Sequence, residues 1–470
     1  MNPENRNMIL AITLSMAVLF GWQMFVVGPE LEKEAAMQQA IAEQEAAAAA
    51  ASGDAPQVDP DAVAGSAGAA ATGQLSASEA APAVEAPRIV IDAPLVSGSI
   101  SLAGLRVDDI MLKAYQETQD PDSENIQFLL KTSTAAPFFA EFGWASADAA
   151  QPMPKSDSVW TASSMVLSPG SPVTLTWENG NGLTFRRQLS INDDYMITVD
   201  DSVESALSAP LTLFPYGLVR RHGTPATTGI YILHEGALGV FDETLREEDY
   251  DDMRDADGGV SEIRPEMPGG WIGFTDKYWL AALLPDQSVN QNFAFKSLAG
   301  PSDRYQVDYI ASEASVLPAG GVVSSQTRLF AGAKKVSLLD GYANELGIAN
   351  FDLAIDFGWF YFLTKPFFYA INWLNSLLGN FGLAVLAFTI VVKLVFFPLA
   401  NKSYRSMGKM RVLSPKIQEI RERHADDRMA MNQAMMALYK EEKVNPAAGC
   451  LPVLLQICLL YTSPSPRDKS

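Results

Sequence analysis

An apolar stretch interrupted by a single lysine constrains this chain more than any other feature of its sequence. Phe381–Ala400 reads FGLAVLAFTIVVKLVFFPLA, and Lys393 is its only charged residue. A helix of about 20 apolar residues is long enough to cross the hydrocarbon core of a bilayer. Basic side chains follow the stretch, at Lys402, Arg405, Lys409 and Arg411. Because Lys and Arg are concentrated on the cytoplasmic side of membrane proteins, this segment is predicted to cross from the outside to the inside.

Lys393 lies about 10 Å from the cytoplasmic end of this predicted span, at the helical rise of about 1.5 Å per residue. A lysine near the middle of a span costs about 2.5–3.5 kcal/mol. Its side chain either extends to the cytoplasmic interface or faces a hydrated cavity between helices. Thr389, one turn earlier on the same face, adds a hydroxyl and favours the cavity. A hydrated cationic groove would shorten the path of a polar flank across hydrocarbon and would attract its acidic residues.

A second apolar run, Met8–Val27, lies near the N-terminus. It is longer than the apolar core of about 7–15 residues in a signal peptide, and no small-residue cleavage site follows it. We therefore interpret it as an uncleaved transmembrane anchor. Arg6 precedes the run and acidic residues follow it, so residues 1–7 are predicted to stay in the cytoplasm. Residues 28–87 are rich in Ala, Pro and Gly and are predicted to form a linker.

Residues 88–350 show the two-residue periodicity of β-strands. In VTLTWENGNGLTFRRQLSI, Val173, Leu175 and Trp177 share one face, and two Asn-Gly pairs then predict a hairpin turn. Similar runs separated by Gly, Pro and Asp continue to the end of the region. The sequence thus predicts a multidomain membrane protein, in which helical transmembrane segments accompany a large antiparallel β-sandwich on the outer side.

Residues 357–378 are aromatic and long enough to resemble another span. If they crossed the membrane, however, the basic residues after Ala400 would face the exterior, contrary to the usual charge bias. Pro366 is predicted to break the segment midway, and its Trp and Tyr residues favour the interface. We predict an amphipathic helix lying on the outer membrane surface.

Residues 401–445 carry ten Lys/Arg against six Asp/Glu and are predicted to form a basic cytoplasmic helical hairpin. Apolar residues recur there at three- and four-residue spacing, with one stripe at Met407, Met410, Leu413, Ile417 and Ile420 and a second at Met431, Met435 and Leu438. Such stripes either pack the two helices together or form a Met-rich surface for client chains. Residues 446–461 begin a further transmembrane helix, and residues 462–470, TSPSPRDKS, do not continue it.

Composition argues against several functions. The net charge of −21 disfavours nucleic-acid binding, which requires a basic face. With only two cysteines and three histidines in the chain, we expect no metal site and no cofactor. His222 and His234 are interpreted as ordinary surface or core residues.

Several segments resemble the YidC-type membrane protein insertases of Gram-negative inner membranes. They are GGWIGFTDKYWLAALLP (residues 269–285), DFGWFYFLTKPFFYAINWLNSLLGNFGLAV (residues 356–385) and the long block from KLVFFPLANKSYRSMGKMR to NPAAGCLPVLLQ (residues 393–456). The resemblance implies a non-enzymatic insertase and chaperone, with a periplasmic β-supersandwich, a surface helix and a five-helix core around a hydrophilic groove. It also implies a multi-pass protein of the bacterial inner membrane with a cytoplasmic N-terminus.

The resemblance implies functional residues as well. Lys393 aligns with the groove arginine of Gram-negative members, so the charge is kept and the bidentate fork is lost. Thr389 and Gln456 fall on positions that face the groove or its client. The hairpin, with Lys402, Arg405, Lys409 and Arg411, would recruit nascent membrane proteins or ribosomes, and the Sec translocon and the phospholipid bilayer are further expected partners. Members of the family continue with three more spans, so we expect this chain to be a C-terminally truncated fragment, inactive alone, whose residues 462–470 lie outside the family pattern.

Two alternatives remain. One is a membrane-anchored periplasmic carbohydrate-binding or mutarotase-like protein, which would need a histidine and a carboxylate for acid–base chemistry. The candidates are His222 and His234, and only His234 has an adjacent acid, Glu235. The other is a tethered periplasmic chaperone. Neither explains Lys393 or the basic hairpin.

Overall fold

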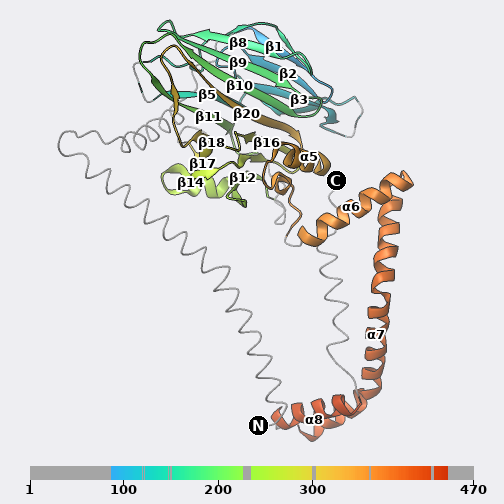
Figure 1. Ribbon diagram of the computed structural model, residues 1–470. Coiled ribbons are helices and arrows are strands. Elements are labelled where there is room, and N and C mark those ends of the chain that lie inside the picture. The colour runs from blue at the N-terminus through green and yellow to red at the C-terminus, as the bar shows by residue number, and fades with distance from the viewer. Residues whose placement is uncertain are drawn as a thin grey trace, which may run out of the picture. The chain divides into compact units, whose positions relative to one another are not determined.

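In a computed structural model, the described part of the chain runs from residue 86 to residue 442, apart from residues 119, 121, 147, 149–150, 226–233, 299–302, 359–360 and 425–427. It contains a β-rich domain followed by three longer helices (Figure 1). The predicted anchor 8–27, most of the predicted linker 28–87, and the segments 446–461 and 462–470, with Gln456, lie outside the described residues.

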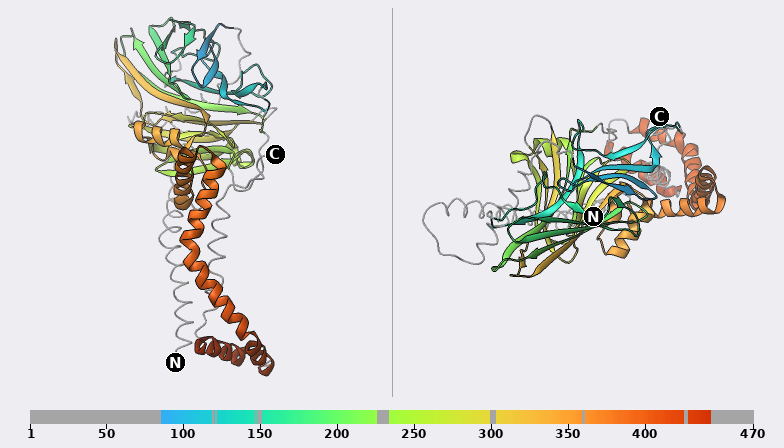
Figure 2. Two further views of the ribbon diagram at one scale, coloured as in Figure 1. Left: turned by 90° about the vertical axis from the view of Figure 1, so that its right-hand side faces the viewer. Right: turned by 90° about the horizontal axis from the view of Figure 1, so that it is seen from above.

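Two large sheets make up the β-rich domain (Figures 1 and 2). The 11-stranded sheet has the strand order β14-β17-β18-β11-β5-β3-β2-β1-β7, with β19 beside β11 and β4 beside β3. Its strands are β1 (Arg88–Asp92), β2 (Val96–Ser101), β3 (Val107–Gln116), β4 (Asn125–Leu129), β5 (Phe138–Ser146), β7 (Val166–Leu167), β11 (Leu211–His222), β14 (Val260–Pro268), β17 (Asn290–Ser297), β18 (Arg304–Ala311) and β19 (Ser315–Leu317).

The 9-stranded sheet has the strand order β13-β12-β15-β16-β20-β10-β9-β8-β6. Its strands are β6 (Thr161–Ala162), β8 (Val173–Glu178), β9 (Leu183–Ile191), β10 (Met196–Ser205), β12 (Gly236–Phe241), β13 (Thr244–Asp249), β15 (Trp271–Thr275), β16 (Trp279–Leu284) and β20 (Val322–Ala333). The described strand pairs are antiparallel except β1 and β7, which run parallel. The predicted fold class, an antiparallel β-sandwich joined to helical segments, is confirmed.

The hairpin of β8 and β9 shows how the local sequence sets the register. The Asn179 side-chain oxygen accepts hydrogen bonds from the backbone amides of Asn181 (2.7 Å) and Leu183 (2.9 Å), which closes the turn. The glycines that follow Asn179 and Asn181 have positive φ values of 71° and 90°, a conformation that glycine adopts without strain. Trp177 therefore lies opposite Phe185, and the apolar side chains of both strands face the core.

Short helical elements complete the domain, namely α4 (Tyr250–Asp255), η2 (Asp257–Gly259), α5 (Val336–Leu346) and η3 (Phe351–Ala354). The last two are anchored in the core between the sheets. Leu339 of α5 and Phe351 of η3 are fully buried. The Phe351 ring lies edge-on to Trp271 at 5.3 Å, and the Trp271 indole donates to the Ala349 carbonyl at 3.2 Å. Buried aromatic pairs of this kind fix the end of the domain firmly.

Helix α6 (Tyr361–Leu378) contains Pro366 in its interior, so the prediction that this proline breaks the segment was wrong. Proline removes one backbone donor at the sixth residue of the helix, and α6 continues past that single loss. None of the residues of α6 is fully buried. Large apolar side chains such as Phe362 and Trp373 are exposed along it.

Helix α7 (Phe381–Arg423) runs without interruption from the apolar stretch into the basic segment, and α8 (Arg428–Glu441) follows it. Ala400 therefore marks a change of composition within one helix. The helix accommodates Pro398 and Pro415, because each removes only one hydrogen bond and strong helix formers surround both. Within the described residues, one helical segment, Phe381–Asn401, is long and apolar enough to cross a membrane.

Candidate functional site

Lys393 lies on the apolar part of α7, and its side chain is exposed. No carboxylate in the described part of the chain lies within ion-pair distance of it. Its neighbours along the helix are large, exposed apolar side chains, including Ile390, Leu394, Val395 and Phe397. An unpaired ammonium surrounded by exposed apolar side chains is costly in lipid unless water reaches it.

Thr389 is one helical turn before Lys393, on the same face, and is also exposed. Its hydroxyl donates to the Val385 carbonyl at 2.8 Å. This bond satisfies the hydroxyl hydrogen within the helix and leaves the oxygen as an acceptor on the surface. The pair thus presents one cationic donor group and one acceptor on an otherwise apolar face.

The predicted recruitment residues Arg405, Lys409 and Arg411 lie on α7 beyond the apolar part, and all three are exposed. The side chain of Lys402 lies outside the described residues. Arg405 and Lys409 are four residues apart and share a helix face, whereas Arg411 points in a different direction. The structure therefore supplies a basic helix with charge on more than one side.

The hairpin of α7 and α8 is held by a small apolar cluster. Leu413 and Leu438 are buried against each other and are flanked by Met410, Ile417 and Ile420. Lys416 and Glu442 form an exposed ion pair at 2.8 Å. Of the two roles left open for the apolar stripes, the packing role therefore accounts for these five residues.

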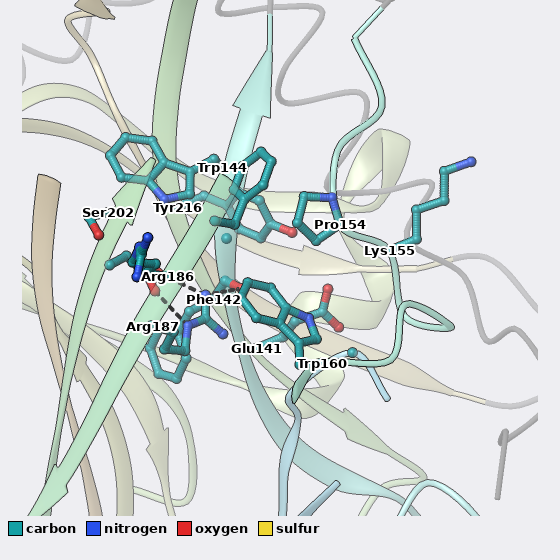
Figure 3. Close-up of a pocket in the computed structure, with 14 residues that line it drawn as sticks. Glu141, Phe142, Trp144, Pro154, Lys155, Trp160, Arg186, Arg187, Ser202 and Tyr216 are labelled. Carbon is teal, nitrogen blue, oxygen red and sulfur yellow. Dashed lines mark hydrogen bonds and ion pairs between the residues drawn. The ribbon is translucent and has the colours of Figure 1, made fainter. Parts of the chain in front are cut away.

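A small cavity between the two sheets is lined by charged and aromatic side chains of the β-rich domain (Figure 3). The Arg187 Nε and Nη2 atoms donate to the Asp201 carboxylate at 2.6 and 2.7 Å, and Nη2 also donates to the Phe142 carbonyl at 2.8 Å. Burial lowers the pKa of Arg187, but the Asp201 carboxylate raises it, and the net direction is upward. The cavity volume is about 20 Å³, enough for roughly one water molecule. It cannot hold a sugar ring.

The two histidines proposed for acid–base chemistry are not arranged for it. In His234, Nδ1 lies 3.0 Å from Asp249 Oδ1 and Nε2 lies 2.8 Å from the Ala237 carbonyl, so both ring nitrogens are engaged. Burial and the nearby guanidinium groups of Arg220 and Arg304 together lower the pKa of His222 to about 4. The acid nearest His234 in the sequence, Glu235, instead accepts from the Lys277 amide.

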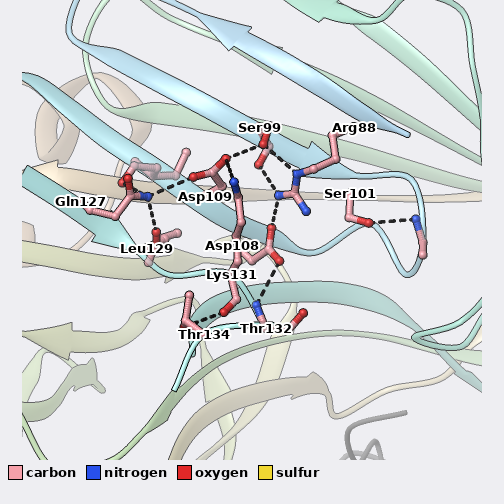
Figure 4. A network of polar contacts seen from close by, with 12 residues as sticks. Arg88, Ser99, Ser101, Asp108, Asp109, Gln127, Leu129, Lys131, Thr132 and Thr134 are labelled. Carbon is pink, nitrogen blue, oxygen red and sulfur yellow. Dashed lines mark hydrogen bonds and ion pairs between the residues drawn. The ribbon is translucent and has the colours of Figure 1, made fainter. Parts of the chain in front are cut away.

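A network of polar side chains connects strands β1 to β4 of the domain (Figure 4). Arg88 of β1 pairs with Asp108 of β3, and its Nε donates to the Ser99 hydroxyl of β2 at 2.7 Å. Asp109 accepts from Gln127 of β4 at 3.0 Å and pairs with Lys131 at 3.2 Å. These carboxylates are used in cross-strand contacts, and no group of potential metal ligands occurs among the described residues.

Sequence reasoning singled out Lys393 but passed over Lys365, a second isolated cation in an apolar helix. Lys365 is the only charged residue of α6 and forms ion pairs with Asp340 and Asp352. The signal that identified Lys393, one charge among aromatic and aliphatic residues, was equally present around Lys365.

Comparison with known proteins gives consistent matches over the length of the chain. The family profile described as "YidC periplasmic domain" matches residues 88–370, and the profile "60Kd inner membrane protein" matches residues 373–462. The membrane protein insertase YidC of Beijerinckia indica is 45% identical over 466 residues, which are 98% of this chain and 76% of that protein. Those of Methylobacterium radiotolerans and Granulibacter bethesdensis are 44% and 43% identical, with 98% of this chain covered and 76% and 77% of the relatives.

Solved structures give a weaker likeness. A galactose mutarotase-like protein from Lactobacillus casei is 12% identical, with a TM-score of 0.36 over 52% of this chain and 99% of that protein. A putative aldose 1-epimerase from Klebsiella pneumoniae is 9% identical, with a TM-score of 0.29 over 50% of this chain and 76% of that protein. Likenesses at this level carry no argument about function.

Proposed function

Because this chain belongs to the YidC family of membrane protein insertases, we propose that it inserts integral membrane proteins into the bilayer and helps them to fold. The observation that carries this conclusion is the 45% identity to a YidC insertase over 98% of the chain. Insertion moves a polypeptide between environments and breaks no covalent bond, so we assign no catalytic residue. The substrates of such a protein are nascent membrane proteins.

We propose that the protein is a multi-pass protein of the bacterial inner membrane with its β-rich domain in the periplasm. Residues 8–27 and 381–400 would cross the membrane, and residues 1–7 would stay in the cytoplasm. The basic residues that follow the apolar part of α7 support this orientation. Helix α6, with no fully buried residue and with exposed aromatic side chains, would lie at the outer interface.

We propose that Lys393, Thr389 and Gln456 line a hydrated groove that receives the polar flank of a client. Support comes from the exposed Lys393 ammonium, which has no carboxylate partner in the described chain, and from the Thr389 hydroxyl on the same face. An open cation attracts acidic client residues without holding them permanently. A buried cation that is already paired with a carboxylate would not attract them.

We propose that Lys402, Arg405, Lys409 and Arg411 form the cytoplasmic surface that first meets clients. The exposure of Arg405, Lys409 and Arg411 on a continuous helix supports this role. A ribosome, whose surface is largely anionic RNA, is the expected partner of a basic helix during synthesis, and the Sec translocon is a further proposed partner. The protein would contact the ribosome through charge alone, without reading nucleic-acid sequence.

The test is complementation of cells depleted of their own insertase by the complete protein carrying Lys393→Ala, Lys393→Glu or Lys393→Arg. We expect Arg to support client insertion, Ala to reduce it and Glu to abolish it. Val391→Ala, an exposed position on the opposite side of the helix, is the matched control and should behave as wild type. Normal insertion by both the Ala and the Glu variants would rule out the groove.

A second experiment tests directly whether water reaches position 393. A cysteine placed at position 393 of the complete protein should react with a water-soluble thiol reagent in intact membranes, whereas a cysteine at 391 should react much more slowly. Equal, slow labelling at both positions would contradict a hydrated groove and leave the family assignment intact.

A further inference from the structure

Lys365 occupies an unusual position for a cation of an interfacial helix. It is the only charged residue of α6, and its side chain is 18% exposed. A lysine on a membrane-surface helix is ordinarily directed into water or toward lipid headgroups. Here the ammonium is instead surrounded by oxygens that belong to the β-rich domain and to its own helix.

The contacts of Lys365 are direct and numerous. Its Nζ donates to Asp340 Oδ1 at 3.0 Å, to Asp352 Oδ2 at 2.5 Å and to the Tyr361 hydroxyl at 2.9 Å. The Tyr361 hydroxyl also donates to Asp352, and the Tyr369 hydroxyl donates to Asp340. We call these five residues the clasp. Tyr361, Lys365 and Tyr369 are spaced by four residues, so one face of α6 supplies all three groups.

The two carboxylates of the clasp are held by firmly packed elements. Asp340 lies on α5, next to the fully buried Leu339, and Tyr342 of the same helix accepts from Asn192 at 2.6 Å. Asp352 lies in η3, next to Phe351, whose ring packs on Trp271. The anionic half of the clasp therefore moves only if the end of the β-rich domain moves.

The opposite face of α6 contacts α7, the helix that carries the proposed groove residues Thr389 and Lys393. The Phe367 ring lies edge-on to the Phe388 ring of α7 at 5.1 Å, and Phe388 precedes Thr389. A chain of contacts thus runs from the core of the β-rich domain through the clasp and α6 to the part of α7 that carries Thr389 and Lys393.

We propose that the clasp fixes α6 to the periplasmic domain, and that Lys365 is a positioning residue which sets the placement of α7 needed for insertion. This inference rests on the proposed insertase function. A lone exposed ion pair would contribute little, but the Lys365 ammonium has three acceptors and little contact with solvent. Charge-assisted hydrogen bonds in such a setting are among the stronger polar contacts in proteins.

The directions of the pKa shifts of Lys365 and Asp352 agree with these contacts. Burial lowers the pKa of Lys365, but hydrogen bonds to Asp352, Tyr361 and Asp340 outweigh it, and the net direction is upward. Burial raises the pKa of Asp352, but hydrogen bonds from Lys365 and Tyr361 outweigh it and hold the pKa below its ordinary value. Both partners therefore keep their charges over the physiological range.

The test compares four variants of the complete protein: Lys365→Met, Lys365→Glu, Lys365→Arg, and Lys365→Glu combined with Asp340→Lys. Met keeps most of the apolar stem of the side chain and removes the ammonium, with its charge and its three hydrogen bonds. We expect Lys365→Met to reduce client insertion about tenfold, equivalent to about 1.4 kcal/mol, and Lys365→Glu to reduce it further. The charge-exchanged double variant should recover a large part of the activity, and Lys365→Arg should be close to wild type.

The matched control is Lys113→Met, which makes the same chemical change at a lysine paired with one carboxylate, Asp92, on the surface of the β-rich domain. It should leave insertion unchanged. A loss of activity in Lys113→Met equal to that in Lys365→Met, or no recovery in the double variant, would overturn the proposal.

A distance measurement separates the clasp from the insertase function. Spin labels at Glu345 on α5 and Asn372 on α6, both exposed, should give a narrow distance distribution in the wild type and in the double variant, and a broad one in Lys365→Met. An unchanged distribution in Lys365→Met overturns the clasp whatever happens to insertion. A broadened distribution with normal insertion overturns the positioning role. If the wild type itself inserts no client, the proposed function fails, while the spin labels still decide on the clasp.

Discussion

The β-rich domain and the apolar part of helix α7 differ in whether their charged side chains are paired. In the domain, charged side chains are buried in pairs: Arg187 lies against Asp201, Arg106 against Glu141, and Lys296 against Asp308, all at 2.6 to 2.8 Å. On α7, Lys393 is exposed and has no such partner within the described chain. These buried charges of the domain are paired with one another, whereas the Lys393 ammonium has no carboxylate within ion-pair distance among the described residues.

The two regions also differ in where their apolar side chains lie. The sandwich encloses its large aromatic residues, such as Trp271, Phe330 and Phe351, almost completely. The apolar part of α7 exposes Phe381, Leu386 and Ile390. A contiguous exposed apolar surface of this extent marks a membrane or protein contact. The domain is therefore stabilised by its own contacts, whereas α7 depends on lipid and on neighbouring helices for its environment.

The largest expected effect follows from breaking a buried pair of the domain. Asp201→Ala leaves the Arg187 guanidinium buried without its carboxylate, and we expect a loss of about 3–5 kcal/mol in the free energy of unfolding. Tryptophan fluorescence of the complete protein during urea unfolding in detergent measures this change, because several buried tryptophans report on the domain.

The matched control removes both charges. The double variant Arg187→Met with Asp201→Leu fills the same space with apolar atoms and should be much closer to wild type than Asp201→Ala, because no unpaired charge remains. If the single and double variants lose the same stability, Arg187 and Asp201 do not act as a unit, and paired burial of charge does not distinguish the domain from α7.

A smaller effect is expected in the hairpin. Leu413→Ala removes a buried side chain from a cluster of only five residues, and we expect a local loss of about 2 kcal/mol, at the lower end of the range for leucine truncation. Hydrogen exchange of the α8 amides should become faster while the strands of the domain keep their protection. Val412→Ala, at an exposed neighbouring position, should change neither. Faster exchange in the strands as well would show that the two regions unfold together.

The effect of pH on the stability of the β-rich domain is expected to be smaller than either of these effects. Burial and neighbouring cations lower the pKa of His222 to about 4, against an ordinary value of about 6.5. The unfolded chain therefore binds a proton more tightly, so stability is full above about pH 6.5 and is lost as the pH falls toward 4. The thermal unfolding temperature of His222→Asn should fall less steeply over this interval. His424→Asn, outside the domain, should follow the wild type, and identical slopes in all three proteins would contradict the assignment.

Much of the domain was predictable because its signals are local. Alternating apolar residues and the Asn179–Gly182 turn lie within one hairpin, and strand pairing then follows from burying one face. The order of the strands was not predictable, because β11 pairs with β5 and β18, segments far apart in the chain. Such pairings depend on the shape of the whole core.

The candidate site was predictable only in part. An isolated lysine in an apolar helix identified Lys393, and the family resemblance supplied its role. The same pattern at Lys365 was not used, because its significance depends on Asp340 and Asp352, which no local pattern connects to it. The interior position of Pro366 also escaped prediction, because the lost hydrogen bond and local clash of a proline do not by themselves end a helix, as Pro398 and Pro415 within α7 also show.

The smallest expected change in stability concerns Lys393 itself. Lys393→Leu replaces an exposed cation by an apolar side chain like those of its exposed neighbours. The free energy of unfolding of the β-rich domain should therefore change by less than about 0.5 kcal/mol. The helix itself should enter the bilayer more readily, because a lysine in a span costs about 2.5–3.5 kcal/mol. Client insertion should nevertheless fall, since the charge that attracts the client flank is gone. Urea unfolding and an insertion assay on the same preparation check both parts. A variant that unfolds as early as Asp201→Ala would show that Lys393 is a paired structural charge like those of the sandwich, and the distinction between the two regions would be lost.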